Sequence, residues 1–280
     1  MDAIWRWIWG HWRAIHEEAL GPLQPAYAGG QGKKQVAAAP AVMPLDWKPI
    51  VILTVTALTL TLQEYAGDRN VFARLVEKTW FPFHPANEYW ELWSFVWWTG
   101  WRVIGYLLIP MGVIALLPGE RIRDYGWSFT GFIKHLKTYA ILFIFVMPVI
   151  YVCSQTRAFR NIYPFYRLAN RSLFDLVSWE IMYALQFLSL EFFFRGFMLN
   201  GLKKTFGAHS IWVMVVPYCM IHYGKTWQET VGAIFAGMIL GTVALRTKSI
   251  WGGVLIHVGV ALSMDLLTIQ SCPKTGPCPR

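Results

Sequence analysis

The sequence predicts an all-α fold: a polytopic membrane helical bundle of about seven transmembrane helices, preceded by an N-terminal interfacial amphipathic helix. The first observation is composition, because 55% of the 280 residues are hydrophobic and only 15% are charged, far more apolar than a soluble domain. The second is that about seven apolar runs follow residue 48, each near the length that crosses a bilayer. The third is that residues 1–20 place apolar and charged side chains on opposite faces of a helix.

The N-terminal segment has the pattern of a helix that lies in the head-group layer. Trp5, Trp9 and Trp12 recur at helical spacing, with Arg6 and Arg13 on the other side. The following segment is rich in Ala, Gly and Pro and is typical of a linker. The expected order is an interfacial amphipathic helix (1–20), a flexible linker (21–48), a transmembrane domain (49–270) and a polar tail (271–280).

The apolar runs define the expected membrane spans. The first is the weakest, since its uninterrupted part ends at Gln63 and Glu64. In the sixth, Ala233, Gly237 and Gly241 stand four residues apart and predict close approach of a neighbouring helix. The runs fall at roughly 49–66, 93–117, 135–153, 174–201, 208–223, 229–246 and 249–269.

The charges favour a membrane surface as partner over nucleic acid. The net charge is +9, but the basic residues lie between apolar runs instead of on one face, which suits contact with anionic lipid head groups. The connections on the N-terminal side carry thirteen Lys and Arg against ten on the other side, which predicts a cytoplasmic N-terminus. Four cysteines show no zinc-ligand spacing, and Cys272 and Cys278 can pair if the tail faces an oxidising compartment.

Two charged residues interrupt the fourth run. Glu191 and Arg195 are four residues apart, so on a helix they share one face and can form an ion pair. Charges at membrane depth are costly even when paired, and they mark functional sites more often than they merely lock helices together. The pair is therefore either a functional site or a structural ion pair.

Later runs add imidazoles and a phenol. Tyr218 and His222 stand one turn apart near the end of the fifth run, and His257 lies in the middle of the seventh. With Glu191 these groups could support hydrolysis, because a carboxylate can take a proton from water while an imidazole donates to the developing oxyanion. Arg195 would keep Glu191 ionised against the effect of burial.

These residues resemble three motifs of a known family. Glu191 to Gly196, the aromatic-x-x-x-His from Tyr218 to His222, and His257 are similar to the motifs of the CAAX protease and bacteriocin-processing family, also called the abortive-infection family. The resemblance covers about residues 175–270. It implies a helical intramembrane endopeptidase that uses glutamate-activated water and no cofactor, with Glu191, Arg195, His222 and His257 catalytic and Tyr218 supporting. The expected substrate is a membrane-anchored or lipidated protein or peptide, and the expected location is a bacterial cell membrane.

Two positions depart from the family pattern. The first motif usually begins with two glutamates, and here Leu190 stands at the first; the third usually has Asn or Asp where this chain has Ala261. Glu229, at the start of the sixth run, or Asp265, two turns past His257, could supply the missing acid. Three hypotheses follow: an endopeptidase, a cleavage-incompetent scaffold that binds membrane peptides or proteins, and a small proton-coupled transporter, for which no repeat of the two halves is detectable.

Overall fold

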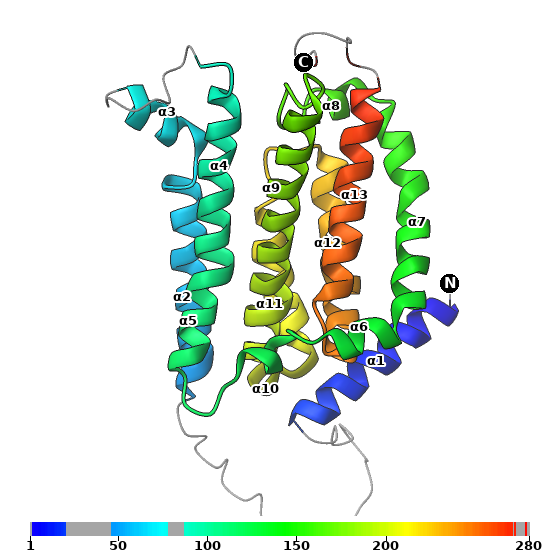
Figure 1. Ribbon diagram of the computed structural model, residues 1–280. Coiled ribbons are helices and arrows are strands. Elements are labelled where there is room, and N and C mark those ends of the chain that lie inside the picture. The colour runs from blue at the N-terminus through cyan, green and yellow to red at the C-terminus, as the bar shows by residue number, and fades with distance from the viewer. Residues whose placement is uncertain (1, 21–45, 78–86, 271, 273–277, 279–280) are drawn as a thin grey trace, which may run out of the picture.

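The computed structural model describes residues 2–20, 46–77, 87–270, 272 and 278. Within these residues every regular element is a helix, and the long helices run side by side as one bundle, with shorter helices at its ends (Figure 1). The all-α membrane fold is therefore confirmed. Most of the expected linker, 21–45, lies outside the described residues; helix α2 begins at Trp47, where Asp46 caps it by accepting a hydrogen bond from the Lys48 backbone N–H at 3.0 Å.

The elements are named as in Figure 1. The longer helices are α1 (Asp2–Leu20), α2 (Trp47–Tyr65), α4 (Trp90–Val103), α7 (Leu136–Ser154), α9 (Leu173–Glu191), α12 (Trp227–Thr247) and α13 (Trp251–Ile269). The shorter helices are α3 (Arg69–Glu77), α5 (Ile109–Leu116), α6 (Phe129–Lys134), α8 (Arg157–Arg160), α10 (Leu199–Phe206) and α11 (Ser210–Met220). Two π-helical segments, η1 (Ile104–Leu108) and η3 (Phe192–Met198), join α4 to α5 and α9 to α10, and η2 (Ile122–Tyr125) and η4 (Gly207–His209) are 3₁₀ turns.

The expected number of about seven spans is not confirmed. Among the described residues, five helical stretches are long and apolar enough to cross a membrane, or six if the pair Trp47–Tyr65 and Arg69–Val76, bent by 52°, is one span. The difference arises because the expected runs 174–201 and 208–223 form one helical stretch, Leu173–Met220. Within that stretch Gly207, with φ of 54°, turns the chain between α10 and α11.

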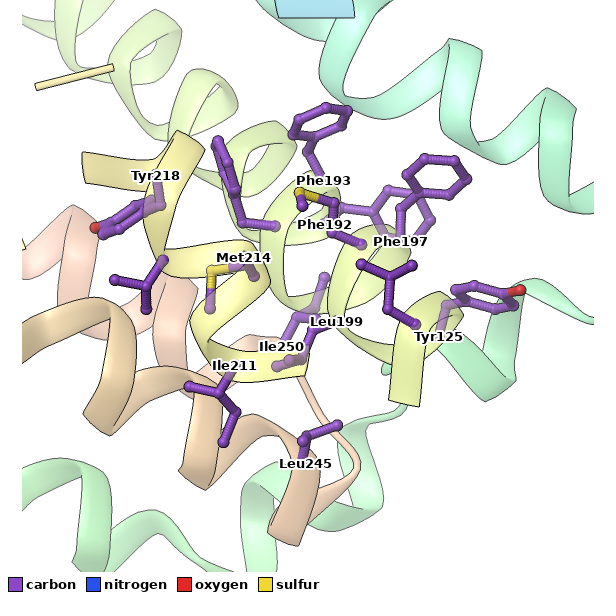
Figure 2. Close-up of a cluster of buried hydrophobic side chains, with 14 of the residues drawn as sticks. Tyr125, Phe192, Phe193, Phe197, Leu199, Ile211, Met214, Tyr218, Leu245 and Ile250 are labelled. Carbon is purple, nitrogen blue, oxygen red and sulfur yellow. The ribbon is translucent and has the colours of Figure 1, made fainter. Parts of the chain in front are cut away.

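Burial separates inner from outer helices. Phe192, Phe193 and Phe197 of η3 have no exposed surface and belong to the cluster drawn in Figure 2, whereas Ile144 and Phe145 of α7 are 67% and 76% exposed. An apolar surface of that extent suits lipid and would be a liability in water. The segment η3, which directly follows Glu191, is thus the most enclosed part of the bundle.

Small residues bring α12 close to its neighbour, as the sequence predicts. A Cβ on Gly237 would lie 3.0 Å from a ring carbon of Tyr218, and a Cβ on Gly241 would lie 3.0 Å from the terminal methyl of Met214. Both neighbours belong to α11, so α11 and α12 are in close backbone approach. This contact sets the depth at which Tyr218 enters the bundle.

Helix α1 forms as expected and packs against the bundle. Ile15 is buried, the Trp12 indole N–H donates to the Thr242 hydroxyl at 3.1 Å, and Lys203 contacts Glu18 at 3.0 Å. An amphipathic helix buries its apolar face wherever apolar surface is available. Part of that face is therefore occupied by protein, and its placement in the head-group layer stays a prediction.

Candidate active site

Glu191 and Arg195 stand at the junction of α9 and η3, and neither side chain has any exposed surface. The Arg195 guanidinium nitrogen Nη1 lies 3.3 Å from Glu191 Oε1, in the i,i+4 arrangement that the sequence predicts. The junction is where the hydrogen bonding changes from α-helical to π-helical. Such π segments are frequent at functional sites.

His257 of α13 joins this pair. Its Nδ1 lies 2.7 Å from Glu191 Oε1, and its Nε2 lies 2.9 Å from the hydroxyl of Tyr218 on α11. An ionised carboxylate only accepts hydrogen bonds, so this short contact favours the tautomer with the hydrogen on Nδ1. In the neutral imidazole Nε2 then accepts from the Tyr218 hydroxyl. Three helices thus build one line of groups, carboxylate to imidazole to phenol, which we call the Glu191 relay.

Two rings fix the orientation of the Glu191 relay. The Phe187 ring, one turn before Glu191 on α9, stacks on the His257 imidazole at 5.3 Å between centroids with 7° between the planes. The Arg195 guanidinium carbon lies 3.9 Å from the centroid of the Tyr218 ring. Stacking restricts each side chain to one plane, and the electron-rich face of the Tyr218 ring stabilises the buried Arg195 cation.

Gly253 makes room for the carboxylate. A Cβ at this position of α13 would lie 2.1 Å from Glu191 Oε2. Any other residue would therefore displace either Glu191 or the backbone of α13. Sequence reasoning did not select Gly253 or Phe187, although the Gly252-Gly253 pair and the i,i−4 spacing of Phe187 from Glu191 are visible signals.

His222 lies beside the Glu191 relay but is not part of it. Its Nδ1 donates to the backbone carbonyl oxygen of Tyr218 at 2.8 Å, and its ring lies 4.9 Å from the Tyr218 ring. His222 follows the end of α11, and burial lowers its pKa to about 3, so the imidazole is neutral at physiological pH. Because Nδ1 of the neutral His222 ring is a donor, its Nε2 has the lone pair and can accept a hydrogen bond.

A small cavity of about 80 Å³ adjoins these residues. Leu190, His222 and Phe187 line it together with Gln186, and Arg102 and Lys225 bring two cations to its wall. No acidic side chain of the described residues lines this cavity. Leu190, the position where the family pattern has its first glutamate, is therefore an apolar part of the wall.

The two acids named as possible substitutes lie elsewhere. Glu229 accepts hydrogen bonds from the Tyr163 hydroxyl at 2.8 and 2.9 Å and pairs with Lys225 at 2.5 Å. Asp265 is fully buried and accepts from the indole N–H of Trp179 at 2.6 Å. Neither acid is bonded to a member of the Glu191 relay. Among the described residues, no group of three or more His, Cys, Asp or Glu could hold a metal ion.

Comparison with known proteins gives a match to a protein-family model. Residues 172–263 match the family model described as Type II CAAX prenyl endopeptidase Rce1-like, and this segment contains every member of the Glu191 relay. No curated protein and no solved structure matched the chain. The matched family is one of proteases, and the apolar helices of this chain suit a protease that works within a membrane. Residues 172–263 of this chain are thus similar to a family of CAAX proteases.

Proposed function

We propose that this protein is an intramembrane endopeptidase that hydrolyses a peptide bond of a membrane-associated substrate with water activated by Glu191 and His257. The observation that carries the proposal is the 2.7 Å contact between His257 Nδ1 and Glu191 Oε1. A fully buried carboxylate beside an imidazole orients the ring and stabilises the imidazolium that forms when the ring accepts a proton. Glu191 thus acts through His257, whose side chain is 15% exposed, while Glu191 itself is fully enclosed.

The proton has a defined route in this mechanism. Attacking water gives its proton to the Tyr218 oxygen as the Tyr218 hydroxyl gives its own proton to His257 Nε2, across the 2.9 Å contact between them. The hydroxide that is formed adds to the substrate carbonyl carbon. The imidazolium then returns the proton by the same route to the leaving amine as the C–N bond breaks, so that the enzyme is unchanged.

Arg195 and His222 have supporting roles. Arg195 places its positive charge 3.3 Å from the Glu191 carboxylate and holds the Tyr218 ring by stacking. His222 is neutral and accepts at Nε2, so it suits binding a water or a substrate N–H better than stabilising an oxyanion. The substrate class, a membrane-anchored or lipidated protein or peptide, and a bacterial cell membrane as location stay predictions of the resemblance.

Binding without cleavage is the second candidate, and Leu190 favours it. The cavity beside His222 is lined by Leu190 where the family pattern has a glutamate, and no acid among the described residues faces it. A water bound there has no carboxylate to accept its proton. A peptide or a carbonyl group could still bind against Gln186 and the neutral imidazole.

The experiment compares cleavage by the full chain reconstituted in lipid vesicles. The substrates are fluorogenic peptides anchored by a transmembrane segment or a farnesylated cysteine. The variants are Glu191→Gln and His257→Gln, and the control is Glu64→Gln, which changes an exposed carboxylate on α2. We expect the first two to lower kcat by about 10²- to 10⁴-fold, the usual contribution of general acid–base groups, and the control to match the wild type.

Two results would contradict the endopeptidase. Equal product from wild type, Glu191→Gln and His257→Gln would remove the Glu191 relay from the chemistry. Binding of the anchored peptides by the wild type without any product would establish the binding function instead. Thermal unfolding of each variant in the same vesicles separates loss of chemistry from loss of fold, since Glu191→Gln leaves the buried Arg195 charge unpaired.

A further inference from the structure

A second cavity, much larger than the one beside His222, lies at the end of the bundle where α1 and α10 are drawn in Figure 1. Its volume is about 900 Å³, within the range of sites that hold small molecules. Its wall is formed by the start of α2, the segment after α5, η2, α10 and the end of α12. None of the residues of the Glu191 relay lines it.

Positive charge dominates this wall. Five basic residues line the cavity, against the three acids Glu18, Glu120 and Asp124. The basic residues come from four separate parts of the chain, and they are Lys48, Arg123, Lys203, Lys204 and Lys248. Basic side chains gathered from distant segments around one hollow indicate an anionic ligand rather than a solvated helix face.

Two of the acids are already neutralised by lysines. Glu120 accepts from Lys48 at 2.7 Å and from the Tyr125 hydroxyl at 2.9 Å, and Glu18 accepts from Lys203 at 3.0 Å. Burial by itself would raise the pKa of Glu120, but these hydrogen bonds lower it overall, so the carboxylate stays ionised and paired. Within the described part of the chain Arg123 and Lys204 form no ion pair within 4.0 Å, and Lys248 reaches Glu18 only at 3.9 Å. The charges of the cavity wall that are left outside these close ion pairs are therefore positive on balance.

The position of the cavity indicates which class of anionic ligand it binds. It opens where the long apolar helices end, which is the depth of the lipid head groups. Trp127 and Tyr125 also line it, and aromatic residues with a polar atom concentrate at this depth. Basic pockets between helix ends are where anionic lipid head groups bind.

We propose that this cavity binds the phosphate head group of an anionic phospholipid. Arg123, Lys204 and Lys248 would contact the phosphate oxygens, and the side chains of Asn200 and Ser128, which also line the cavity, offer partners for head-group hydroxyls. A soluble phosphate ester presents the same oxygens, so the test must separate the two sources. The site is independent of the proposed protease chemistry.

The cavity also reaches Asn200 of α10, the helix that directly follows the π segment η3 with Arg195. Asn200 donates its side-chain N–H to the Arg195 backbone carbonyl oxygen at 2.9 Å while lining the cavity. A head group bound at Asn200 would therefore contact a side chain that is hydrogen-bonded to the backbone of Arg195, the partner of Glu191. Arg195 is therefore the one residue between this lipid site and Glu191.

The experiment titrates the full chain, purified in a neutral detergent, with phosphatidylglycerol, with phosphatidylcholine and with glycerol 3-phosphate, and counts bound molecules by native mass spectrometry. The test variant is Arg123→Gln with Lys204→Gln. The control is Lys134→Gln with Lys137→Gln, which removes two exposed lysines from the same end of the bundle outside the cavity. We expect phosphatidylglycerol to bind wild type and control alike and to bind the test variant about ten- to thirtyfold more weakly.

Three results would overturn the proposal. They are equal affinity of all three proteins for phosphatidylglycerol, equal affinity of the wild type for phosphatidylcholine, and binding of glycerol 3-phosphate as tight as that of the lipid. Should the test variant not fold, Arg123→Lys with Lys204→Arg provides a second measurement. This variant keeps both charges and must retain binding.

Discussion

Tyr218 combines two properties that a substitution can separate. Its hydroxyl contacts His257 Nε2 at 2.9 Å, and its ring supports Arg195 at 3.9 Å. The substitution Tyr218→Phe removes the hydroxyl contact with His257 and keeps the ring contact with Arg195. We expect kcat to fall about 10²-fold or more, because the proton route is interrupted. The free energy of unfolding should fall by only about 1 kcal/mol, the net value of one hydrogen bond, and thermal unfolding in lipid measures this.

Tyr218→Leu is the matched comparison. It removes the ring as well, leaves the Arg195 guanidinium without its stacking partner and opens a void in the cluster of Figure 2. We expect this variant to lose about 3 kcal/mol or more of stability. If Tyr218→Phe instead keeps wild-type kcat while Tyr218→Leu is unstable, then Tyr218 only positions Arg195.

Most residues of the candidate site could be predicted from their type and place in the sequence. Which of them contact one another could not. Glu191, Arg195 and His257 were predicted because charge and imidazole are costly in apolar runs, and Tyr218 was predicted from its spacing of one turn from His222. That His257, and not His222, contacts the carboxylate depends on the distances between three helices, which no spacing along one chain fixes. Phe187 was not predicted because an aromatic residue in an apolar run is ordinary until its partner ring is known.

Helix α13 holds its place against α9 because Gly253 has no side chain. In Gly253→Ala the new methyl would overlap Glu191 Oε2, so α13 or Glu191 must move. We expect a loss of about 1–3 kcal/mol in stability, the usual cost of overpacking, and loss of cleavage because the contact between His257 and Glu191 lengthens. Thermal unfolding and the vesicle cleavage assay measure the two effects.

Gly232 is the matched control for this variant. It lies on α12 with no atom within 4 Å of its ideal Cβ, so Gly232→Ala adds the same methyl to an open position. We expect unchanged cleavage and a gain of at most about 1 kcal/mol from helix propensity. Comparable losses in both variants would mean that α13 tolerates alanine no worse than an exposed helix does.

The bends within helices are what the sequence predicted least well. The apolar runs predicted the positions of the helices. The residues Phe192–Met198 do not predict a π-helix, because their four phenylalanines are equally compatible with an α-helix. Gly207 turns the chain between the expected runs 174–201 and 208–223, but the stretch Leu173–Met220 stays helical through this turn. The span count differed because helical continuity through η3 and η4 is decided by packing and not by hydropathy.

The two ends of the bundle differ in chemistry, and this asymmetry predicts the topology. Lys48, Arg123, Lys203 and Lys248 gather at the end where α10 lies. At the opposite end Cys272 and Cys278 form a disulfide, and the Cys278 backbone N–H donates to the Arg167 carbonyl oxygen at 3.0 Å. Disulfides persist in oxidising compartments, while basic connections concentrate on the cytoplasmic side. Both features predict that the C-terminal end lies outside the cell.

Accessibility of the tail thiols tests this orientation. In intact cells that produce the full chain, we expect a membrane-impermeant reductant followed by a membrane-impermeant maleimide to label Cys272 and Cys278, as mass spectrometry of the tail peptide detects. Without reductant the same peptide should carry a disulfide and no label, because both sulfurs are bonded. The free thiols Cys153 and Cys219 are partly buried near the ends of α7 and α11, and any label on them forms with or without reductant, so the reductant-dependent label reports the tail alone. Labelling of the tail only in opened cells would place the C-terminal end in the cytoplasm and reverse the side assigned to the basic cavity.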